Sequence, residues 1–349
     1  MAVPPCILFF ADAGPEVGGG HVMRCLTLAR ALTERGAECA FVESRSAIQF
    51  LRRFGWPSQT LLAVAQTDDL AGLVAYAREF ANLFEPDIVV MDHYGAGQAE
   101  ETLLRRLGRK VVVLDDLADR AHDADLLIDP GYGRKAEAYR GLVPEGAVVL
   151  GGASYALVRP EFPDARHRAM SRRARHGPVK RALVSLGLTD VGGVTGRVVE
   201  ALRPQLGETR LDIVLGSGAP SLEALSRAAE SDRRLHLWID TAEMASLMAD
   251  ADICIGAGGS SVWERSVVGL PSATLVLAEN QRDMAHRMAE AGLCLTLDVT
   301  AGGFEAELTA AWTSLTEDAD LRWRLAERSS EQCDGQGAGR AAAAVLWLL

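Results

Sequence analysis

The chain has 349 residues, 48% of them hydrophobic, so it is long enough for about two domains with buried cores. Its 36 basic and 47 acidic residues give a net charge of −11, which argues against nucleic acid or an anionic membrane surface as the main partner. The six cysteines lack disulfide or zinc spacing, and no apolar stretch has the length of a signal peptide core or a membrane span. We therefore expect a cytoplasmic globular protein that holds any anionic ligand in a local site.

In the first half of the chain, short apolar runs rich in β-branched residues alternate with segments of helical period. This alternation predicts buried strands of a parallel sheet with helices between them. The expected strands cover residues 7–10, 39–42, 87–91, 110–114, 125–128 and 148–150.

The first of these strands leads into a glycine turn, Gly18-Gly19-Gly20, which is followed by His21 and a helical pattern. Glycines allow a ligand to approach the backbone closely, and the first helical turn offers unpaired N–H groups to an anion. A histidine at this position is well placed to transfer a proton beside a bound phosphate or sugar. The alternative is a tight strand-to-helix turn without a ligand.

A basic stretch at 166–181 marks the expected domain junction, and a second series of strands follows it at 181–185, 211–215, 235–239, 252–255 and 273–277. We expect the basic stretch to be a linker or a solvated helix face rather than a phosphate-binding patch. The predicted organisation is an N-terminal domain at 1–160, a basic linker at 161–180 and a C-terminal domain at 181–349. The Ala-rich helix at 339–349 can pack on either half.

Ligands of open parallel sheets bind at the carboxyl ends of the strands. Asp92-His93-Tyr94 and Asp115-Asp116 both follow strands of the first half, which predicts that they lie on the ligand side together with His21. Asp115-Asp116 either takes part in catalysis or caps the next segment. The Asp-Ala-Asp triplets at 123–125 and 250–252 precede their strands, so we interpret them as caps and turn formers and predict no required metal.

In the second half, the glycine turn at 256–261 follows a strand and opens a helix, which predicts a second anion site suited to a diphosphate. Glu264, one turn further, either accepts ribose hydroxyls or forms a capping box with Ser261. Asn280-Gln281 follows another strand, where amide side chains can bind sugar hydroxyls or N-acetyl groups; the alternative is a helix N-cap at Asn280. The turn at 185–190 also follows a strand.

Several of these motifs, in this order, resemble the PseG family of UDP-2,4-diacetamido-2,4,6-trideoxy-β-L-altropyranose hydrolases. The resemblance is carried by residues 18, 20–24, 92–94, 114–120, 152, 155–162, 256–264 and 279–281. It implies an α/β, GT-B-like fold similar to that of MurG, with two Rossmann-like, doubly wound parallel-sheet domains facing a cleft and the nucleotide held mainly by the C-terminal one. The chain has Gly187-Leu188-Thr189-Asp190 where the family usually has Gly-Gly-Thr-Asp, which leaves the exact sugar open.

The resemblance implies hydrolysis of a UDP-linked 2,4-diacetamido-2,4,6-trideoxyhexose to free sugar and UDP in pseudaminic acid biosynthesis, without a cofactor or metal. It implies His21 as the base that activates water for C1–O cleavage. The expected substrate-binding residues are Gly19, Gly20, Arg24, Asp92, Tyr94, Asp115, Arg159, Ser185, Gly187, Thr189, Asn280 and Gln281, and the expected UDP-binding residues are Gly258, Gly259, Ser260, Ser261 and Glu264. A MurG-like UDP-sugar glycosyltransferase and a non-catalytic nucleotide-sugar-binding subunit are the alternatives. The sequence does not specify the oligomeric state.

Overall fold

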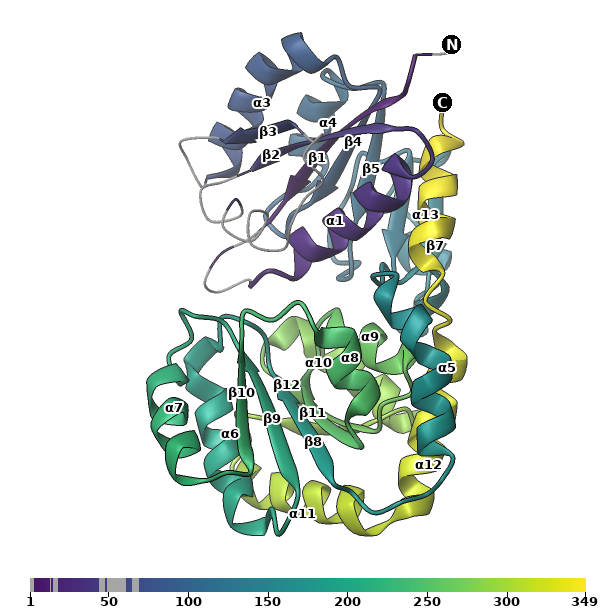
Figure 1. Cartoon of the computed structure of the whole chain (residues 1–349). Coiled ribbons are helices and arrows are strands. Elements are labelled where there is room, and N and C mark those ends of the chain that lie inside the picture. Colours follow the sequence, from purple (N-terminus) through teal and green to yellow (C-terminus); the bar gives the residue numbers. More distant parts are fainter. Residues whose placement is uncertain (1–2, 13, 15–17, 44–47, 49–60, 65–68) are drawn as a thin grey trace. The chain divides into compact units, whose positions relative to one another are not determined.

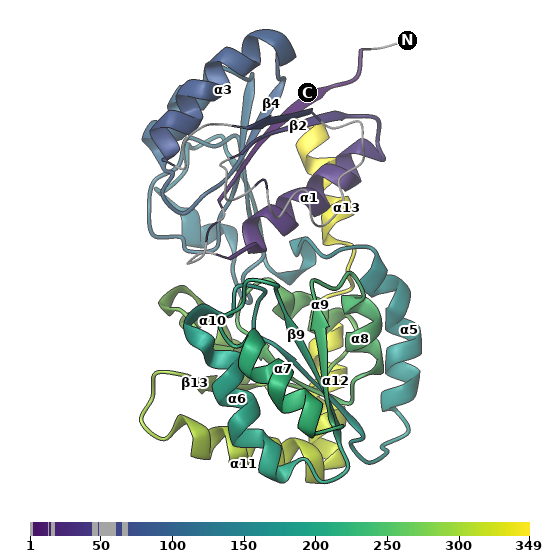
Figure 2. The same ribbon diagram turned by 60° about the vertical axis from the view of Figure 1, so that its left-hand side comes forward.

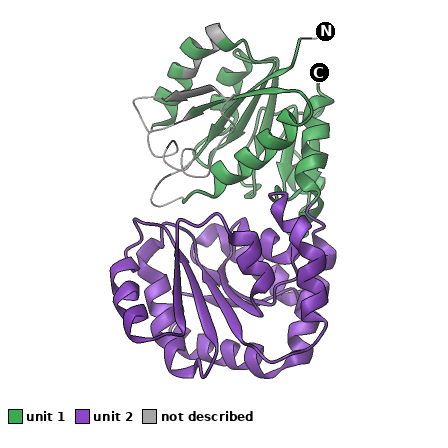
Figure 3. Cartoon of the chain, viewed as in Figure 1, with its two compact units in different colours: residues 1–158, 336–349 green, residues 159–335 purple. Residues whose placement is uncertain are grey.

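The computed structural model describes residues 3–12, 14, 18–43, 48, 61–64 and 69–349, and the chain forms two compact units (Figure 3). Unit 1 comprises Met1–Val158 and Gln336–Leu349, and unit 2 comprises Arg159–Gly335. No helix in these described ranges is long and apolar enough to cross a membrane.

Unit 1 contains a seven-stranded sheet in the order β3-β2-β1-β4-β5-β6-β7, in which every neighbouring pair is parallel. Because the order reverses between β1 and β4, the sheet is doubly wound, with helices on both of its faces. Its elements are β1 (Cys6–Ala11), α1 (Gly20–Thr33), β2 (Glu38–Glu43), β3 (Leu61–Val64), α3 (Leu70–Phe84), β4 (Ile88–Asp92), α4 (Gln98–Arg105), β5 (Lys110–Leu114), β6 (Leu126–Asp129), β7 (Val148–Gly151) and α13 (Gly337–Leu346).

Successive side chains of β1 point to opposite faces of the sheet and so belong to two different hydrophobic clusters. Ile7 and Phe9 belong to one buried cluster, whereas Leu8 and Phe10 belong to the cluster on the other face of the sheet. The first cluster also contains apolar residues of α1 and α13, which lie side by side in both ribbon views (Figures 1 and 2). The C-terminal helix therefore completes the core of unit 1, and its small alanines allow it to pack closely.

Unit 2 repeats this arrangement with a six-stranded parallel sheet in the order β10-β9-β8-β11-β12-β13, which reverses between β8 and β11. Its elements are α5 (Glu161–Arg173), β8 (Arg181–Ser185), α6 (Val194–Leu202), β9 (Arg210–Leu215), α7 (Leu222–Ser231), β10 (Leu235–Ile239), α8 (Met244–Asp250), β11 (Ile253–Ala257), α9 (Ser261–Val267), β12 (Ser272–Val276), α10 (Glu279–Glu290), β13 (Leu295–Asp298), α11 (Phe304–Glu317) and α12 (Ala319–Gln332).

The strands expected from the apolar runs are confirmed in both units, and the sequence prediction lacked only β3 and β13 among the described strands. Both missed strands are four residues long, which is short for a pattern of apolar residues to reveal.

The division of the chain differs from the predicted one in two places. Residues 161–173 form helix α5 of unit 2 rather than a linker, because several of their arginines donate hydrogen bonds to backbone carbonyls of unit 2. Residues 336–349 belong to unit 1, because α13 buries Ala341, Ala342 and Val345 in the core that α1 shares.

The start of α13 allows a direct test of this assignment. A Cβ atom at Gly337 would lie 2.6 Å from Ala156 N and closer still to Ala156 O, whereas a Cβ at Gly339 would meet only the Arg35 guanidinium, at 3.3 Å. We expect Gly337→Ala to lower the free energy of unfolding by about 1–3 kcal/mol, since backbone atoms must move to relieve the overlap. Urea unfolding followed by circular dichroism measures this change.

Gly339→Ala in the same helix is the matched control. Because alanine favours the helix and only a flexible side chain must move, its stability should stay within about 1 kcal/mol of the wild type. Equal stability of the two variants would contradict the packing of α13 against residue 156.

Candidate functional site

In unit 1 the candidate site lies where the strand order reverses. The chain leaves β1 and enters α1 through the glycine turn, and β4, the neighbour of β1, ends at Asp92. A crevice forms at such a switch point because the connections on its two sides run in opposite directions. His21, the second residue of α1, and Asp92 are thereby brought together from positions 71 residues apart.

The centre of this group is the buried carboxylate of Asp92. His21 Nδ1 lies 2.6 Å from Asp92 Oδ1, and Arg24 donates from Nη2 to Oδ1 and from Nε to Oδ2, both at 2.6 Å. Asp92 is fully buried, and His21 and Arg24 are 5% and 8% exposed. His21 and Arg24 share one face of α1 because their spacing is three residues.

Electrostatics fix the roles of these three side chains. Burial alone favours the neutral carboxyl, but Arg24 and His21 more than offset it and hold the pKa of Asp92 well below its usual range. An ionised carboxylate accepts hydrogen bonds only, so His21 donates to it from Nδ1, and Nε2 is the ring nitrogen left for proton transfer. His21 Nε2 is therefore the basic nitrogen of the group.

Tyr94 and Asp116 complete the group around His21. The Tyr94 ring meets the imidazole edge to face, with centroids 4.4 Å apart, and its hydroxyl donates to Asp116 Oδ2 at 3.4 Å. Asp116 also accepts from Arg24 Nη1 at 2.7 Å. Burial and the nearby Asp116 carboxylate raise the pKa of Tyr94, so Tyr94 keeps its proton at neutral pH.

Asp115, an expected substrate-binding residue, is not part of the His21 group. It is 1% exposed, and its Oδ2 accepts the amides of Leu117 and Ala118 together with the Tyr139 hydroxyl. Of the two interpretations left open for Asp115-Asp116, the structure gives the capping role to Asp115, whereas Asp116 contacts Arg24 and Tyr94 of the His21 group.

The glycine turn before α1 is described in part. Gly18 has a φ of 77°, which favours glycine, and its amide donates to Gly14 O at 2.8 Å. Gly19 is the N-cap of α1, where no side chain caps the helix, and Gly20 is the first helical residue. Residues 15–17 lie outside the described ranges.

In unit 2 the strand order reverses between β8 and β11, and the predicted residues Ser185 and Gly258 stand at the carboxyl ends of these strands. Gln281 contacts the same turn: its Oε1 accepts the Leu277 amide at 3.1 Å, and a Cβ at Gly258 would lie 3.1 Å from it. A side chain at position 258 would therefore crowd Gln281. The glycine turn at 256–261 and the Asn280-Gln281 segment, which were expected as separate parts of the site, are therefore in contact.

A buried arginine that the sequence analysis missed supports the turn at 257–261. Arg265 is 2% exposed and donates to Ala257 O at 2.9 Å, to Ser261 Oγ at 3.1 Å and to Thr274 Oγ1 at 3.2 Å. A Cβ at Gly256 would lie 2.5 Å from its Nη1, which explains a glycine inside a buried strand. Among the described residues, its hydrogen-bond acceptors are neutral, so a positive charge lies directly beneath this turn.

Glu264 pairs with another predicted residue, Arg159. Arg159 Nε and Nη2 lie 3.0 and 2.9 Å from Glu264 Oε1, and both side chains are partly exposed. The capping box with Ser261 is absent from α9, whose N-cap is Ser260 without a side-chain hydrogen bond. The N-cap of α10 is Ala278, so the capping alternative for the exposed Asn280 is wrong as well.

The loop after β8 contains Gly187, whose φ of 102° favours glycine, and the half-buried Thr189. The departure from the family pattern, Leu188, accepts the Gly216 amide with its carbonyl at 2.9 Å, which ties this loop to the end of β9. The buried Asp190 accepts the amides of Thr195 and Ser221 and thus fixes the loop from below.

The Asp-Ala-Asp triplets have structural partners, but Asp125 and Asp252 bind backbone amides at the starts of neighbouring strands and do not act as the expected caps and turn formers. Asp125 accepts the Val111 amide, and Asp252 accepts those of Lys180 and Arg181. Within the described ranges, no three His, Cys, Asp or Glu side chains are grouped so that they could hold a metal ion.

The neighbour of Asp115 in its buried network, Asp129, gives a pH-dependent test. Tyr139 Oη lies 2.8 Å from both Asp115 and Asp129, but a hydroxyl has one proton to donate. Burial raises the pKa of Asp129 to about 6, above the value of about 3.9 in the unfolded chain. A raised carboxyl pKa stabilises the folded state at low pH, and this contribution is lost as the pH rises through about 4 to 6.

We therefore expect the wild type to lose about 2–3 kcal/mol of stability relative to Asp129→Asn between about pH 4 and pH 7, from a shift of about two pKa units. Urea unfolding at both pH values measures this difference. Asp119→Asn, at a carboxylate that is 61% exposed, is the control for the removal of one negative charge. If the difference in free energy of unfolding between Asp129→Asn and the wild type is the same at both pH values, the pKa of Asp129 is not raised.

Comparison with known proteins adds information on the whole chain. Residues 195–332 match the family model "Glycosyltransferase family 28 C-terminal domain". The UDP-2,4-diacetamido-2,4,6-trideoxy-beta-L-altropyranose hydrolase of Campylobacter jejuni is 26% identical over 290 residues, which cover 82% of this chain and 97% of that protein. The spore coat polysaccharide biosynthesis protein SpsG of Bacillus subtilis is 26% identical over 333 residues, or 94% of each protein.

The crystal structure of Acinetobacter baumannii MurG is similar to this structure, with a TM-score of 0.67 and 18% identity over 99% of this chain and 100% of that chain. The shared fold agrees with the two doubly wound sheets described above. The chain therefore has a GT-B-like α/β fold, and its resemblance to the UDP-2,4-diacetamido-2,4,6-trideoxy-β-L-altropyranose hydrolases, expected from the motifs, is confirmed.

Proposed function

We propose that this protein hydrolyses a UDP-linked 2,4-diacetamido-2,4,6-trideoxyhexose to the free sugar and UDP. Water attacks the anomeric carbon as His21 Nε2 accepts its proton, the C1–O bond breaks, and UDP departs with both electrons of that bond. The observation that carries the proposal is the 2.6 Å contact between His21 Nδ1 and the buried Asp92 carboxylate. This contact fixes the imidazole tautomer and stabilises the imidazolium that forms.

Arg24 and Tyr94 have supporting roles in this step. Arg24 keeps Asp92 ionised, because its guanidinium binds both carboxylate oxygens. Tyr94 holds the imidazole plane from one side and, together with Asn280, is proposed to contact the sugar. Asp116 joins them as a further proposed substrate-binding residue, because it contacts both Arg24 and Tyr94.

The UDP group is assigned to unit 2. The amides of Gly258 to Ser261 are proposed to bind the diphosphate, with the buried Arg265 cation beneath them, and Glu264 is proposed to accept the ribose hydroxyls. The relative from Campylobacter jejuni is named as a UDP-sugar hydrolase, which supports UDP as the group that the site binds. Stabilisation of the departing diphosphate is an electrostatic contribution to catalysis.

A UDP-sugar glycosyltransferase is the second candidate, favoured by the family 28 match and the likeness to MurG. In that reaction an acceptor hydroxyl replaces water, while the nucleotide site is unchanged. Release of free sugar without an acceptor distinguishes hydrolysis from transfer. The role in pseudaminic acid biosynthesis and the cytoplasmic location stay predictions.

We expect His21→Asn to abolish turnover and to leave UDP affinity within about threefold of the wild type, since general-base catalysis contributes about 10²–10⁴-fold. Turnover is measured by UDP release and affinity by calorimetry. His167→Asn, at an exposed histidine of α5, is the control and should keep full activity. Near-normal kcat in the His21→Asn variant would show that another group activates the water.

We expect Glu264→Ala to weaken UDP binding about tenfold to a hundredfold, because a hydrogen bond to a charged group contributes about 1.5–3 kcal/mol. Glu223→Ala removes an exposed carboxylate of α7 and serves as the control for charge. If Glu264→Ala reduces stability but not UDP affinity, the pair with Arg159 is structural and the ribose contact is wrong.

A further inference from the structure

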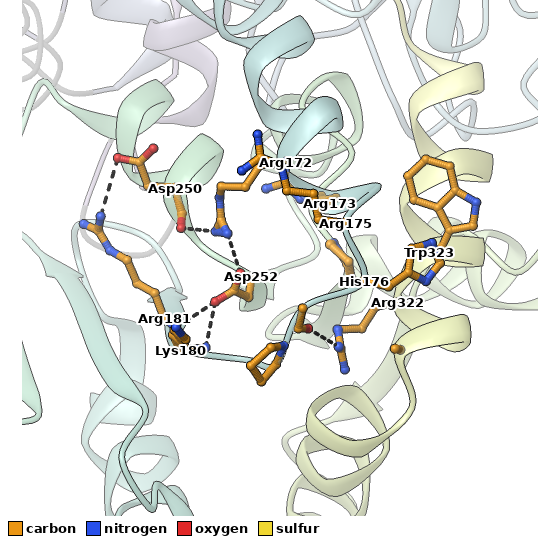
Figure 4. Close-up of a pocket in the computed structure, with 14 residues that line it drawn as sticks. Arg172, Arg173, Arg175, His176, Lys180, Arg181, Asp250, Asp252, Arg322 and Trp323 are labelled. Atoms are coloured by element: carbon orange, nitrogen blue, oxygen red, sulfur yellow. Dashed lines mark hydrogen bonds and ion pairs between the residues drawn. The ribbon is translucent and has the colours of Figure 1, made fainter.

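Figure 4 shows a pocket in unit 2 with a volume of about 290 Å³. It lies at the opposite end of the six-stranded sheet from the proposed UDP site. Arg181 begins β8, Asp252 precedes β11 and Pro271 precedes β12, so the pocket is formed at the amino ends of these strands. The end of α5, the loop after it and the start of α12 close its other sides. All of its lining residues belong to unit 2.

The pocket is strongly basic although the chain carries a net charge of −11. Six cationic and two carboxylate side chains line it, which leaves an excess of four positive charges when His176 is neutral. The cations are Arg172, Arg173, Arg175, Lys180, Arg181 and Arg322, and the carboxylates are Asp250 and Asp252.

Four of the arginines build the framework of the pocket. Arg172 and Arg181 pair with Asp252 and Asp250, and Arg173 donates to Met248 O at 2.7 Å. Arg322 donates to Gly177 O at 2.7 Å and so ties the loop after α5 to α12. These bonds hold the walls in place without a ligand, so an anion would bind with little reorganisation.

Two cations remain for a ligand. The guanidinium of Arg175 and the ammonium of Lys180 are exposed, and neither has a hydrogen-bond or ion-pair partner among the described residues. Both occur in the loop that Arg322 fixes, and Figure 4 draws them with the other residues that line the pocket. The rings of His176 and Trp323 lie next to each other in the lining, with centroids 5.5 Å apart and planes tilted by 40°.

The framework arginines also repel one another. Burial lowers the pKa of Arg173 to about 9, and the adjacent positive charge of Arg172 acts in the same direction. Arg181 also pairs with Asp212, and His176 lies 4.0 Å from Asp320, but neither of these carboxylates lines the pocket. Within the lining, two carboxylates face six cations. A bound anion would offset this repulsion.

We propose that this pocket is a binding site for a small phosphate-bearing anion, held by Arg175 and Lys180 within the field of the framework arginines. Guanidinium groups match the geometry of phosphate oxygens, and lysine adds a point charge. The volume is at the lower end of the range for ligand pockets, which fits pyrophosphate or a sugar phosphate. The site is independent of the proposed UDP site and uses none of its residues.

The test is calorimetric titration of pyrophosphate into the full chain with UDP in excess, which keeps pyrophosphate out of the proposed UDP site. The wild type should bind about one pyrophosphate per chain. Arg175→Gln/Lys180→Gln should weaken this binding at least tenfold and leave UDP affinity unchanged. Arg106→Gln/Arg109→Gln removes two exposed charges from unit 1 and should bind pyrophosphate as the wild type does.

Three results would overturn the proposal: no binding to the wild type, equal binding by the Arg175→Gln/Lys180→Gln variant, or equal losses in both double variants. The last result would indicate a general charge effect. Failure of the wild type to bind UDP would contradict the proposed function instead. In that case, the pyrophosphate affinities of the two double variants would still test whether this pocket binds the anion.

Discussion

The proposed chemistry depends on one buried carboxylate. Asp92 lies at the end of β4 without solvent exposure, and hydrogen bonds from Arg24, His21 and the Cys25 thiol stabilise its charge there. Its position is set by the parallel register of β1 and β4, which pairs Ala11 with Asp92. Since α1 is the helix that comes next after β1, His21 and Arg24 lie within reach of this carboxylate. The pairing of β1 with β4 therefore positions Asp92, and Asp92 in turn orients the His21 imidazole.

Unit 2 uses a buried cation at the equivalent point of its own sheet. Arg265 lies under the turn after β11 and bonds to neutral oxygens, so its charge is not cancelled by a nearby carboxylate among the described residues. A buried charge without a counter-ion is costly, and a bound diphosphate would compensate it. Arg265 therefore has the place and the charge of a residue that favours an anion at this turn.

Much of this could be predicted from the sequence, because the strands are continuous apolar runs and ligand residues follow their carboxyl ends. That rule brought His21, Asp92 and Tyr94 together. It could not choose between Asp115 and Asp116, since both follow β5 and neighbouring side chains point in different directions. Arg265 was missed because an arginine after Glu264 also fits a solvated helix face, although Gly256 within an apolar strand was a signal of a close approach. The arginines of α5 were assigned to a linker because a charge run does not reveal which carbonyls it will meet.

The central claim is that water attacks the sugar carbon and that UDP leaves intact. Hydrolysis in water labelled with heavy oxygen, followed by mass spectrometry of both products, tests it most directly. Because His21 is proposed to activate water toward C1, the label should appear in the free sugar, and UDP should remain unlabelled. Label in UDP would mean attack at phosphorus and would contradict the assignment of His21 as the base for C1–O cleavage.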